Sequence, residues 1–206
     1  MRRSTPPLAK LLEAAGVVEP PVDAVAMAQR HLGMAVCLDH KLTEEQRQRT
    51  VAHKIGEHLK ADLLRRLGID PSEPRAMAGE SLANRFAERL LVPTGWLAEQ
   101  ARLGGFDLFA LKRIFRTASH EVIAWRLLDL PEPSIITVVD NEQVSRRRGN
   151  TCRPPRDLSD AERHCLTQVQ RYSRPCAVNA DGWHVQGWPI HQVDWKREIL
   201  RSQVDE

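Results

Sequence analysis

The chain has 206 residues, of which 42% are hydrophobic, enough to bury a sizeable core in one large domain or in a core domain with a small appendage. Its 30 basic and 27 acidic residues give a formal net charge of +3, which excludes the global polybasic field that by itself indicates nucleic acid. No apolar run approaches the ~18 residues of a membrane span, and the first residues lead into Pro6 and Pro7 rather than a signal-peptide core. We therefore expect a cytoplasmic protein that does not enter a membrane.

The first third of the chain predicts helices and one short strand. Apolar spacing and a following glycine predict helices over 8–15 and 22–32. The stretch "MAVCL" at 34–38 has the composition of a strand. Thr43, followed by two glutamates, begins a long helical stretch whose apolar residues recur at helical spacing as far as Gly68.

Three more helices are expected before residue 131. The two prolines of "GIDPSEP" cannot continue the helix, and a second helix then runs from about Ala76 to Val92, where Pro93 stops it. Two shorter helices lie within 107–130, "DLFALKRIF" and "SHEVIAWRLLDL", joined by the tight connection "RTA". This pair has the length and joint of a helix-turn-helix. The alternative, that both helices simply pack beside the core, is favoured because apolar residues leave few polar positions to face bases in the second helix. We expect no sequence-specific DNA binding.

The composition changes beyond Pro131, which predicts a domain over 1–131 and a small β-containing region over 132–206. "SIITVVD" is the best strand signal in the chain, and the run Arg146 to Arg148 with "GNTCRPPR" indicates an exposed loop. A capping box over Ser159–Glu162 opens one more helix.

The end of the chain predicts a hairpin and one further element. "PCAVNADGWHVQGW" is typical of a hairpin with its turn at Asp181-Gly182. "DWKREILRS" is a terminal helix or strand. The three tryptophans of this region are expected to build the core of the small β unit: Trp183, Trp188 and Trp195.

A candidate metal site lies in "TVAHKIGEHL", residues 50–59. His53 and Glu57 are four residues apart, so on a helix their side chains project side by side and can converge on one cation. Glu80 lies one turn before Asn84 on a helix that a short loop can lay antiparallel to the first, which brings a third ligand within reach. The plainer interpretation is an amphipathic helix whose His53 is partly exposed and whose Glu57 pairs with a nearby lysine.

Three motifs resemble the ImmA/IrrE family of zincin-like metallo-endopeptidases. "AHKIGEH" resembles the family's A-H-E-x-G-H helix, "ESLANRFAERLLVP" matches its second motif almost position for position, and "FRTASHEVIAWRLLDL" is similar to its third. The resemblance covers roughly residues 8–140 and implies an α+β fold with a mainly helical zincin-like core. It also implies a hydrolase that acts on a protein or peptide, such as a transcriptional repressor.

The resemblance assigns roles one residue at a time. His53 matches the first metal ligand, Glu80 matches the carboxylate ligand, and Glu57 stands where the second histidine belongs but can still bind through oxygen. Asn84 falls beside these ligands, where a residue that orients them would stand. The implied cofactor is zinc or another divalent metal, held less selectively than by two histidines.

Lys54 departs from the family pattern at the general-base position. The resembled enzymes have a glutamate there, which takes a proton from metal-bound water, and an ammonium group has no lone pair for that task. Lys54 can instead replace the metal as the counter-charge of Glu57 and Glu80, which would leave a metal-free site. Two hypotheses remain: an impaired metallopeptidase or pseudoenzyme that acts in transcription regulation, and a non-catalytic regulatory binding module, for which DNA is one candidate partner.

Overall fold

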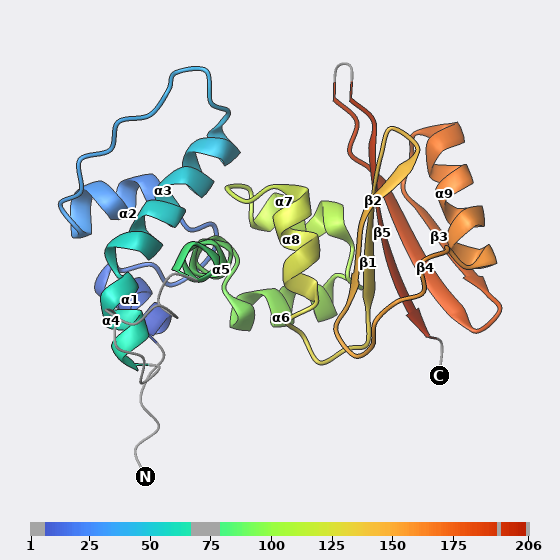
Figure 1. The fold of residues 1–206 in the computed structure, drawn as a ribbon, viewed down its shortest axis with the longest axis horizontal. Coiled ribbons are helices and arrows are strands. Elements are labelled where there is room, and N and C mark those ends of the chain that lie inside the picture. The colour runs from blue at the N-terminus through green and yellow to red at the C-terminus, as the bar shows by residue number, and fades with distance from the viewer. Residues whose placement is uncertain (1–6, 67–78, 193–194, 205–206) are drawn as a thin grey trace, which may run out of the picture. The chain divides into compact units, whose positions relative to one another are not determined.

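The computed structural model describes residues 7–66, 79–192 and 195–204 (Figure 1). The chain is α+β and forms two compact units: Met1–Trp96 with Arg113–Ser119, and Leu97–Lys112 with His120–Glu206. We call them unit 1 and unit 2. The division at residue 131, which the change in composition indicates, does not coincide with these packing units and stays a prediction about domains.

Unit 1 is built from helices. They are α1 (Pro7–Ala14), α2 (Ala24–His31), α3 (Glu44–His58), α4 (Lys60–Arg66) and α5 (Gly79–Leu91). The strand predicted at 34–38 is wrong, because this segment has no strand beside it in the described part of unit 1 and stays irregular. The single long helix predicted from Thr43 is interrupted at Leu59, where α3 ends and α4 begins. Gly68, "GIDPSEP" and the predicted start of α5 lie outside the described residues.

Hydrogen bonds at its N-terminus fix where α3 begins. The Thr43 hydroxyl accepts a hydrogen bond from the Gln46 N–H (3.3 Å), and the Gln46 side chain accepts one from the Thr43 N–H (2.8 Å), which forms a capping box. Gln48, which is buried, accepts a hydrogen bond from the Ala24 N–H at 2.7 Å. This bond ties the first turn of α2 to α3.

Close packing fixes α3 against α5. A Cβ atom added at Gly56 would lie 3.0 Å from the backbone of Ala83 and 3.2 Å from the Phe86 ring. Val51, Ile55 and the facing residues of α5 are buried around this contact. The glycine therefore allows the two motif helices to approach each other closely, and this approach shapes the candidate site.

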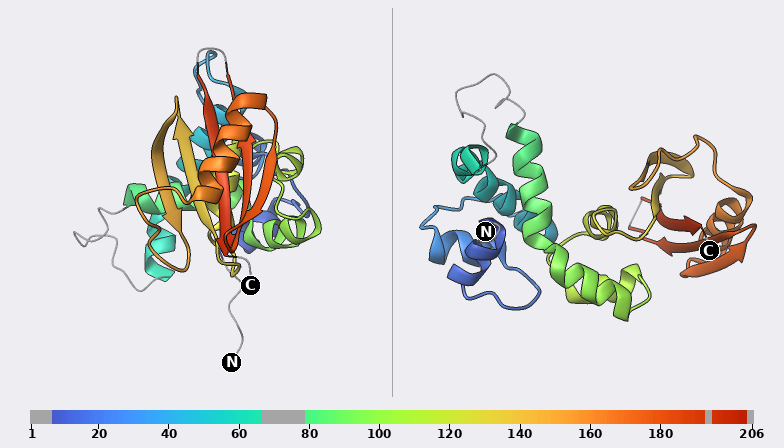
Figure 2. Two further views of the ribbon diagram at one scale, coloured as in Figure 1. Left: turned by 90° about the vertical axis from the view of Figure 1, so that its right-hand side faces the viewer. Right: turned by 90° about the horizontal axis from the view of Figure 1, so that it is seen from below.

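Unit 2 combines helices with one antiparallel sheet. Its remaining elements, some of which begin or end across the unit limits, are α6 (Thr94–Leu103), α7 (Leu108–Ile114), α8 (His120–Leu127), α9 (Asp160–Tyr172), β1 (Ile135–Asp140), β2 (Gln143–Gly149), β3 (Cys176–Ala180), β4 (Trp183–Pro189) and β5 (Arg197–Val204). The strand order is β2-β1-β5-β4-β3, and every neighbouring pair is antiparallel. In Figures 1 and 2 the sheet has α8 on one face and α9 on the other.

Several predictions for this region are confirmed. β1 covers the apolar run "IITVVD", and the Ser159 capping box opens α9. The hairpin turn lies at Asp181 and Gly182, whose φ values of 53° and 73° fit a two-residue hairpin turn. The last segment resolves as a strand, β5, which lies at the centre of the sheet.

Two predictions for this region are wrong. Arg146 to Arg148 lie in β2 rather than in a loop, because backbone pairing with β1 holds the strand although its side chains are charged. Trp195 is 43% exposed in the β4–β5 connection, whereas Trp188 is buried and Trp183 packs at the edge of the core. The segment "TGWLAEQARL", for which no element was predicted, forms α6.

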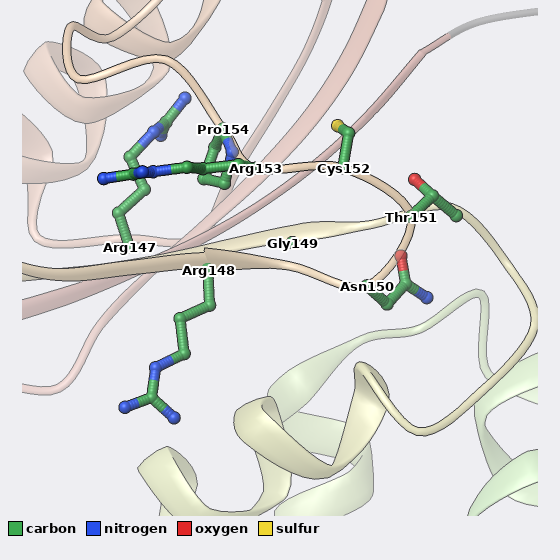
Figure 3. Close-up of a pocket in the computed structure, with 8 residues that line it drawn as sticks. All are labelled: Arg147, Arg148, Gly149, Asn150, Thr151, Cys152, Arg153 and Pro154. Atoms are coloured by element: carbon green, nitrogen blue, oxygen red, sulfur yellow. The ribbon is translucent and has the colours of Figure 1, made fainter.

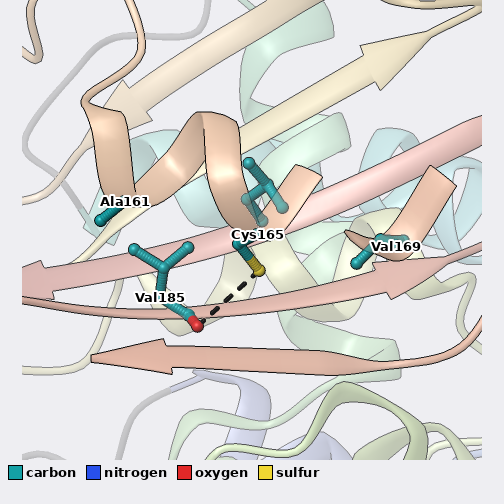
Figure 4. Packing of buried hydrophobic residues seen from close by; sticks show 5 residues of the cluster. Ala161, Cys165, Val169 and Val185 are labelled. Atoms are coloured by element: carbon teal, nitrogen blue, oxygen red, sulfur yellow. Dashed lines mark hydrogen bonds between the residues drawn. The ribbon is translucent and has the colours of Figure 1, made fainter. Parts of the chain in front are cut away.

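The core between α9 and the sheet is a small cluster of buried, mostly apolar side chains (Figure 4). Its buried members are Ala161, Cys165, Val169, Val185 and Leu200. The Cys165 thiol lies 3.8 Å from the Val185 carbonyl oxygen, to which it donates a weak hydrogen bond. Burial, and then the neighbouring Cys176, raises the pKa of Cys165 to about 12. Cys165 is thus a packing residue.

Among the residues described, no helix is long and apolar enough to cross a membrane.

Candidate functional site

A groove in unit 1 contains most of the residues that the motifs single out. Its volume is about 470 Å³, and it is lined by Arg49, Thr50, His53, Lys54 and Glu57 of α3 together with Asn84 of α5. These α3 residues share one side of the helix because they are spaced by three or four. The groove therefore joins the two motif helices at their contact.

His53 is held by both helices. Its Nδ1 atom lies 3.1 Å from the Asn84 amide oxygen, and its Nε2 atom lies 3.5 Å from Glu57 Oε1. An amide oxygen only accepts, so Nδ1 must be the donor, and in the neutral ring Nε2 keeps its lone pair. Asn84 thus sets the tautomer that a metal-binding histidine requires.

The spacing of His53 and Glu57 fits a metal ion. Two ligand atoms about 2.1 Å from a tetrahedral zinc lie about 3.4 Å apart, close to the 3.5 Å between Nε2 and Oε1. Glu80 lies in α5 one turn before Asn84, but its side chain is not among those described. Within the described residues no group of three or more His, Cys, Asp or Glu side chains is placed to bind a metal. The structure thus brings together His53 and Glu57, two of the three residues predicted as ligands.

The charge of the groove differs from the sequence-based expectation. Lys54, which follows His53 in the sequence, lines the groove, and Arg49 adds a second cation that the motif comparison missed. Arg49 lies one turn before His53, so its spacing was a usable signal. Among the described groove residues two cations face one carboxylate, Glu57, and this balance weakens the attraction for a dication.

The helix pair predicted within 107–130 forms α7 and α8. Side chains of α8 contact arginines of the sheet in unit 2. Glu121 accepts from Arg146 at 2.5 Å and from Arg197 at 2.7 Å. The Arg148 guanidinium lies over the Trp125 ring at 5.5 Å. These contacts engage Glu121 and Trp125 of α8 within unit 2.

A second pocket, of about 490 Å³, lies at the end of β2 in unit 2 (Figure 3). Arg147 and Arg153 lie on one side of the strand, whereas Arg148 points to the other. Arg147 is already engaged, since its two terminal nitrogens each lie 2.9 Å from a Glu162 oxygen. The pocket is therefore a shallow surface whose cations are largely used within the fold.

No family model matches the chain, and no curated protein matches it. The fold is similar to a solved structure described as a Mycobacterium tuberculosis transcriptional regulator, with a TM-score of 0.66 and 19% identity. That match covers 96% of this chain and 74% of the other. At this identity the likeness shows the fold alone.

Proposed function

We propose that the chain is an ImmA/IrrE-like metallopeptidase homologue with an impaired catalytic site, which acts in regulation by binding or cleaving a protein such as a transcriptional repressor. Unit 1 would provide a zincin-like core, and the groove between α3 and α5 would be its site. The solved structure with a similar fold is described as a transcriptional regulator, which is compatible with a regulatory role.

The observation that carries the proposal is the position of His53 between the two motif helices. Asn84 fixes the imidazole, and Glu57 lies at a ligand-to-ligand distance from Nε2. Neither contact is needed to pack an amphipathic helix, because His53 is 25% exposed and Glu57 is 54% exposed.

The metal would be held by His53, Glu57 and Glu80. Once bound, it would supply a Lewis acid and an acidified water molecule. In this chain Asn84 orients the imidazole, and Arg49 and Lys54 place positive charge beside the reaction centre. An ammonium at the general-base position cannot accept a proton, so hydrolysis should be slow or absent while a peptide can still bind.

The first test measures zinc affinity and peptide hydrolysis in protein purified without chelator. The wild type is compared with Lys54→Glu and with Lys54→Glu combined with Glu57→His, which restores the family's motif. Lys54→Glu removes a positive charge, adds a negative one and supplies a base, so zinc affinity should rise by about tenfold or more. Hydrolysis should appear in the double variant.

Lys60→Glu is the matched control, since it makes the same charge change close by in α4 but outside the lining of the groove. It should alter zinc affinity much less than Lys54→Glu. Tight zinc binding and hydrolysis by the wild type, both unchanged in Lys54→Ala, would contradict the proposal.

The alternative function is a non-catalytic regulatory binding module. The observation in its favour is the excess of cations in the described groove, with Arg49 and Lys54 facing Glu57. In that case no variant of Lys54 would gain zinc-dependent hydrolysis, and Arg49→Ala would weaken capture of the protein partner.

A further inference from the structure

Unit 2 contains a buried arginine, Arg201, whose guanidinium is only partly hydrogen-bonded by the described residues. Arg201 lies in the central strand β5 and is 1% exposed. One terminal nitrogen, Nη1, donates to the Gln186 side-chain oxygen at 3.2 Å. The Phe106 ring covers one face of the guanidinium, with 4.0 Å between the guanidinium carbon and the ring centre. Burial lowers the pKa of Arg201 to about 10, so the group is still charged at neutral pH.

The remaining nitrogens of Arg201 form one edge of the guanidinium that lacks a described hydrogen-bond partner. Nε and Nη2 are both buried, and neither has a hydrogen-bond partner among the described residues. These two N–H groups point in the same direction, and together they form the edge with which arginine binds two oxygens of one carboxylate. A buried charge is expected to have all its donors satisfied. The geometry therefore presents a complete bidentate donor pair.

The turn between α6 and α7 places Phe106 against the face of the Arg201 guanidinium. Gln186 also donates to the Gly105 carbonyl oxygen at 3.0 Å, and the Trp188 indole N–H donates to Asp107 at 3.0 Å. Phe106, between these two anchors, has a positive φ of 61°, a conformation that non-glycine residues rarely adopt. The turn is thus held over Arg201 by specific contacts with the sheet.

Glu132 is the competing partner within the chain. Its Oε1 atom pairs with Arg102 at 2.8 Å, and its Oε2 atom is buried without a described hydrogen-bond partner. Glu132 and Arg201 influence each other's charge, but no hydrogen bond joins them. Arg102 pairs with Oε1 of Glu132, and no described hydrogen bond joins Glu132 to the Nε or Nη2 atom of Arg201.

We propose that Arg201 binds a small oxyanion of carboxylate geometry through Nε and Nη2, beneath the α6–α7 turn. Two oxygens of the anion accept from the two N–H groups, and Phe106 shields the pair from water. The site belongs to unit 2 and does not depend on the metal site proposed in unit 1.

The test follows the Arg201 Nε–H resonance of the full chain by NMR during titration with sodium formate. Sodium chloride at the same ionic strength is the reference, because it screens charge without offering two oxygens. Formate should shift the Arg201 signal saturably and raise the melting temperature above the chloride value. A signal that responds equally to formate and chloride would overturn the proposal.

Two arginine variants make the result specific. Arg201→Lys keeps the charge but loses the donor edge, so formate affinity should fall by about tenfold or more. Arg197→Lys is the control, since Arg197 lies on the same face of β5 and its guanidinium is already paired with Asp140 and Glu121. If Arg201→Lys fails to fold, the Nε–H titrations of the wild type and of Arg197→Lys decide the matter.

The variant Glu132→Gln distinguishes binding of an external anion to Arg201 from pairing of Arg201 with the Glu132 carboxylate. If an external anion is the partner, the wild type binds formate and Glu132→Gln binds it about equally. Formate binding that emerges only in Glu132→Gln would mean that Glu132 fills the edge in the native protein, and the proposal would be wrong.

Discussion

At the scale of single residues, the contact between His53 and Asn84 links the two motif helices and decides what the imidazole can do. An amide oxygen at Nδ1 leaves Nε2 as the atom that faces Glu57. Without this contact the ring could rotate and present either nitrogen. The orientation of one side chain therefore depends on a residue 31 positions away.

Replacing Asn84 by leucine should weaken metal binding through His53. Loss of an orienting hydrogen bond to a metal-binding histidine typically lowers affinity about 10–100-fold. Zinc titration by calorimetry measures the effect, and Arg85→Ala, an exposed change on the same helix, should leave the affinity close to wild type. Equal zinc affinity in Asn84→Leu and the wild type would show that Asn84 does not orient the ligand.

At the scale of elements, the approach of α3 to α5 depends on a glycine. A Cβ atom at Gly56 would meet backbone atoms of Ala83, which cannot move without shifting α5. The groove that His53 and Asn84 share lies at this same contact. Helix packing and site geometry are therefore coupled.

Gly56→Ala should destabilise the protein by about 1–3 kcal/mol through overpacking, despite the better helix propensity of alanine. Gly95→Ala in α6 is the matched control, because a Cβ there has nothing within 4 Å. It should be neutral or stabilise by up to about 1 kcal/mol. Urea denaturation measures both changes, and a Gly56→Ala variant as stable as Gly95→Ala would mean that the two helices are not in close contact.

At the scale of the whole molecule, buried carboxylates set how stability depends on pH. Burial opposes ionisation of Glu162, yet Arg147, Ser202 and the Ser159 N–H more than offset it and hold the pKa of Glu162 below its usual range. Burial likewise opposes ionisation of Asp140 and Glu132. Hydrogen bonds and the charge of Arg197 and Arg102 offset this effect and lower the pKa of each carboxyl. Each carboxylate is more acidic in the folded chain than in the unfolded chain.

Stability should therefore fall in acid. A carboxyl whose pKa is depressed on folding stabilises the protein fully above its unfolded pKa, and this contribution is lost as the pH falls through the folded pKa. The urea midpoint should be nearly constant from pH 7 to about pH 5 and should fall progressively below that.

Glu162→Gln tests the most buried of these three carboxylates. This change leaves Arg147 without its charged partner, so it should destabilise the protein by about 3–5 kcal/mol at neutral pH and flatten the acid decline. Glu99→Gln, on the exposed side of α6, should do neither. A Glu162 variant with the wild-type pH profile would show that this carboxylate does not govern the acid response.

The sequence alone determined the elements that carry strong local signals. Thr43 and Ser159 form capping boxes, and Asp181-Gly182 forms a two-residue turn, because each signal is satisfied within a few residues. The helical spacing of His53 and Glu57 likewise placed them side by side, since neighbours one turn apart need only a helix. Their predicted role as metal ligands, with Glu80, remains to be tested.

Features that depend on residues far apart along the chain became apparent only in the folded structure. β2 is a strand because β1 pairs with it, although its arginines suggested a loop. Arg201 is buried because the α6–α7 turn covers it, and nothing in the local sequence around β5 indicates that burial. Backbone pairing and desolvation are set by residues far away along the chain, so a local pattern cannot predict them.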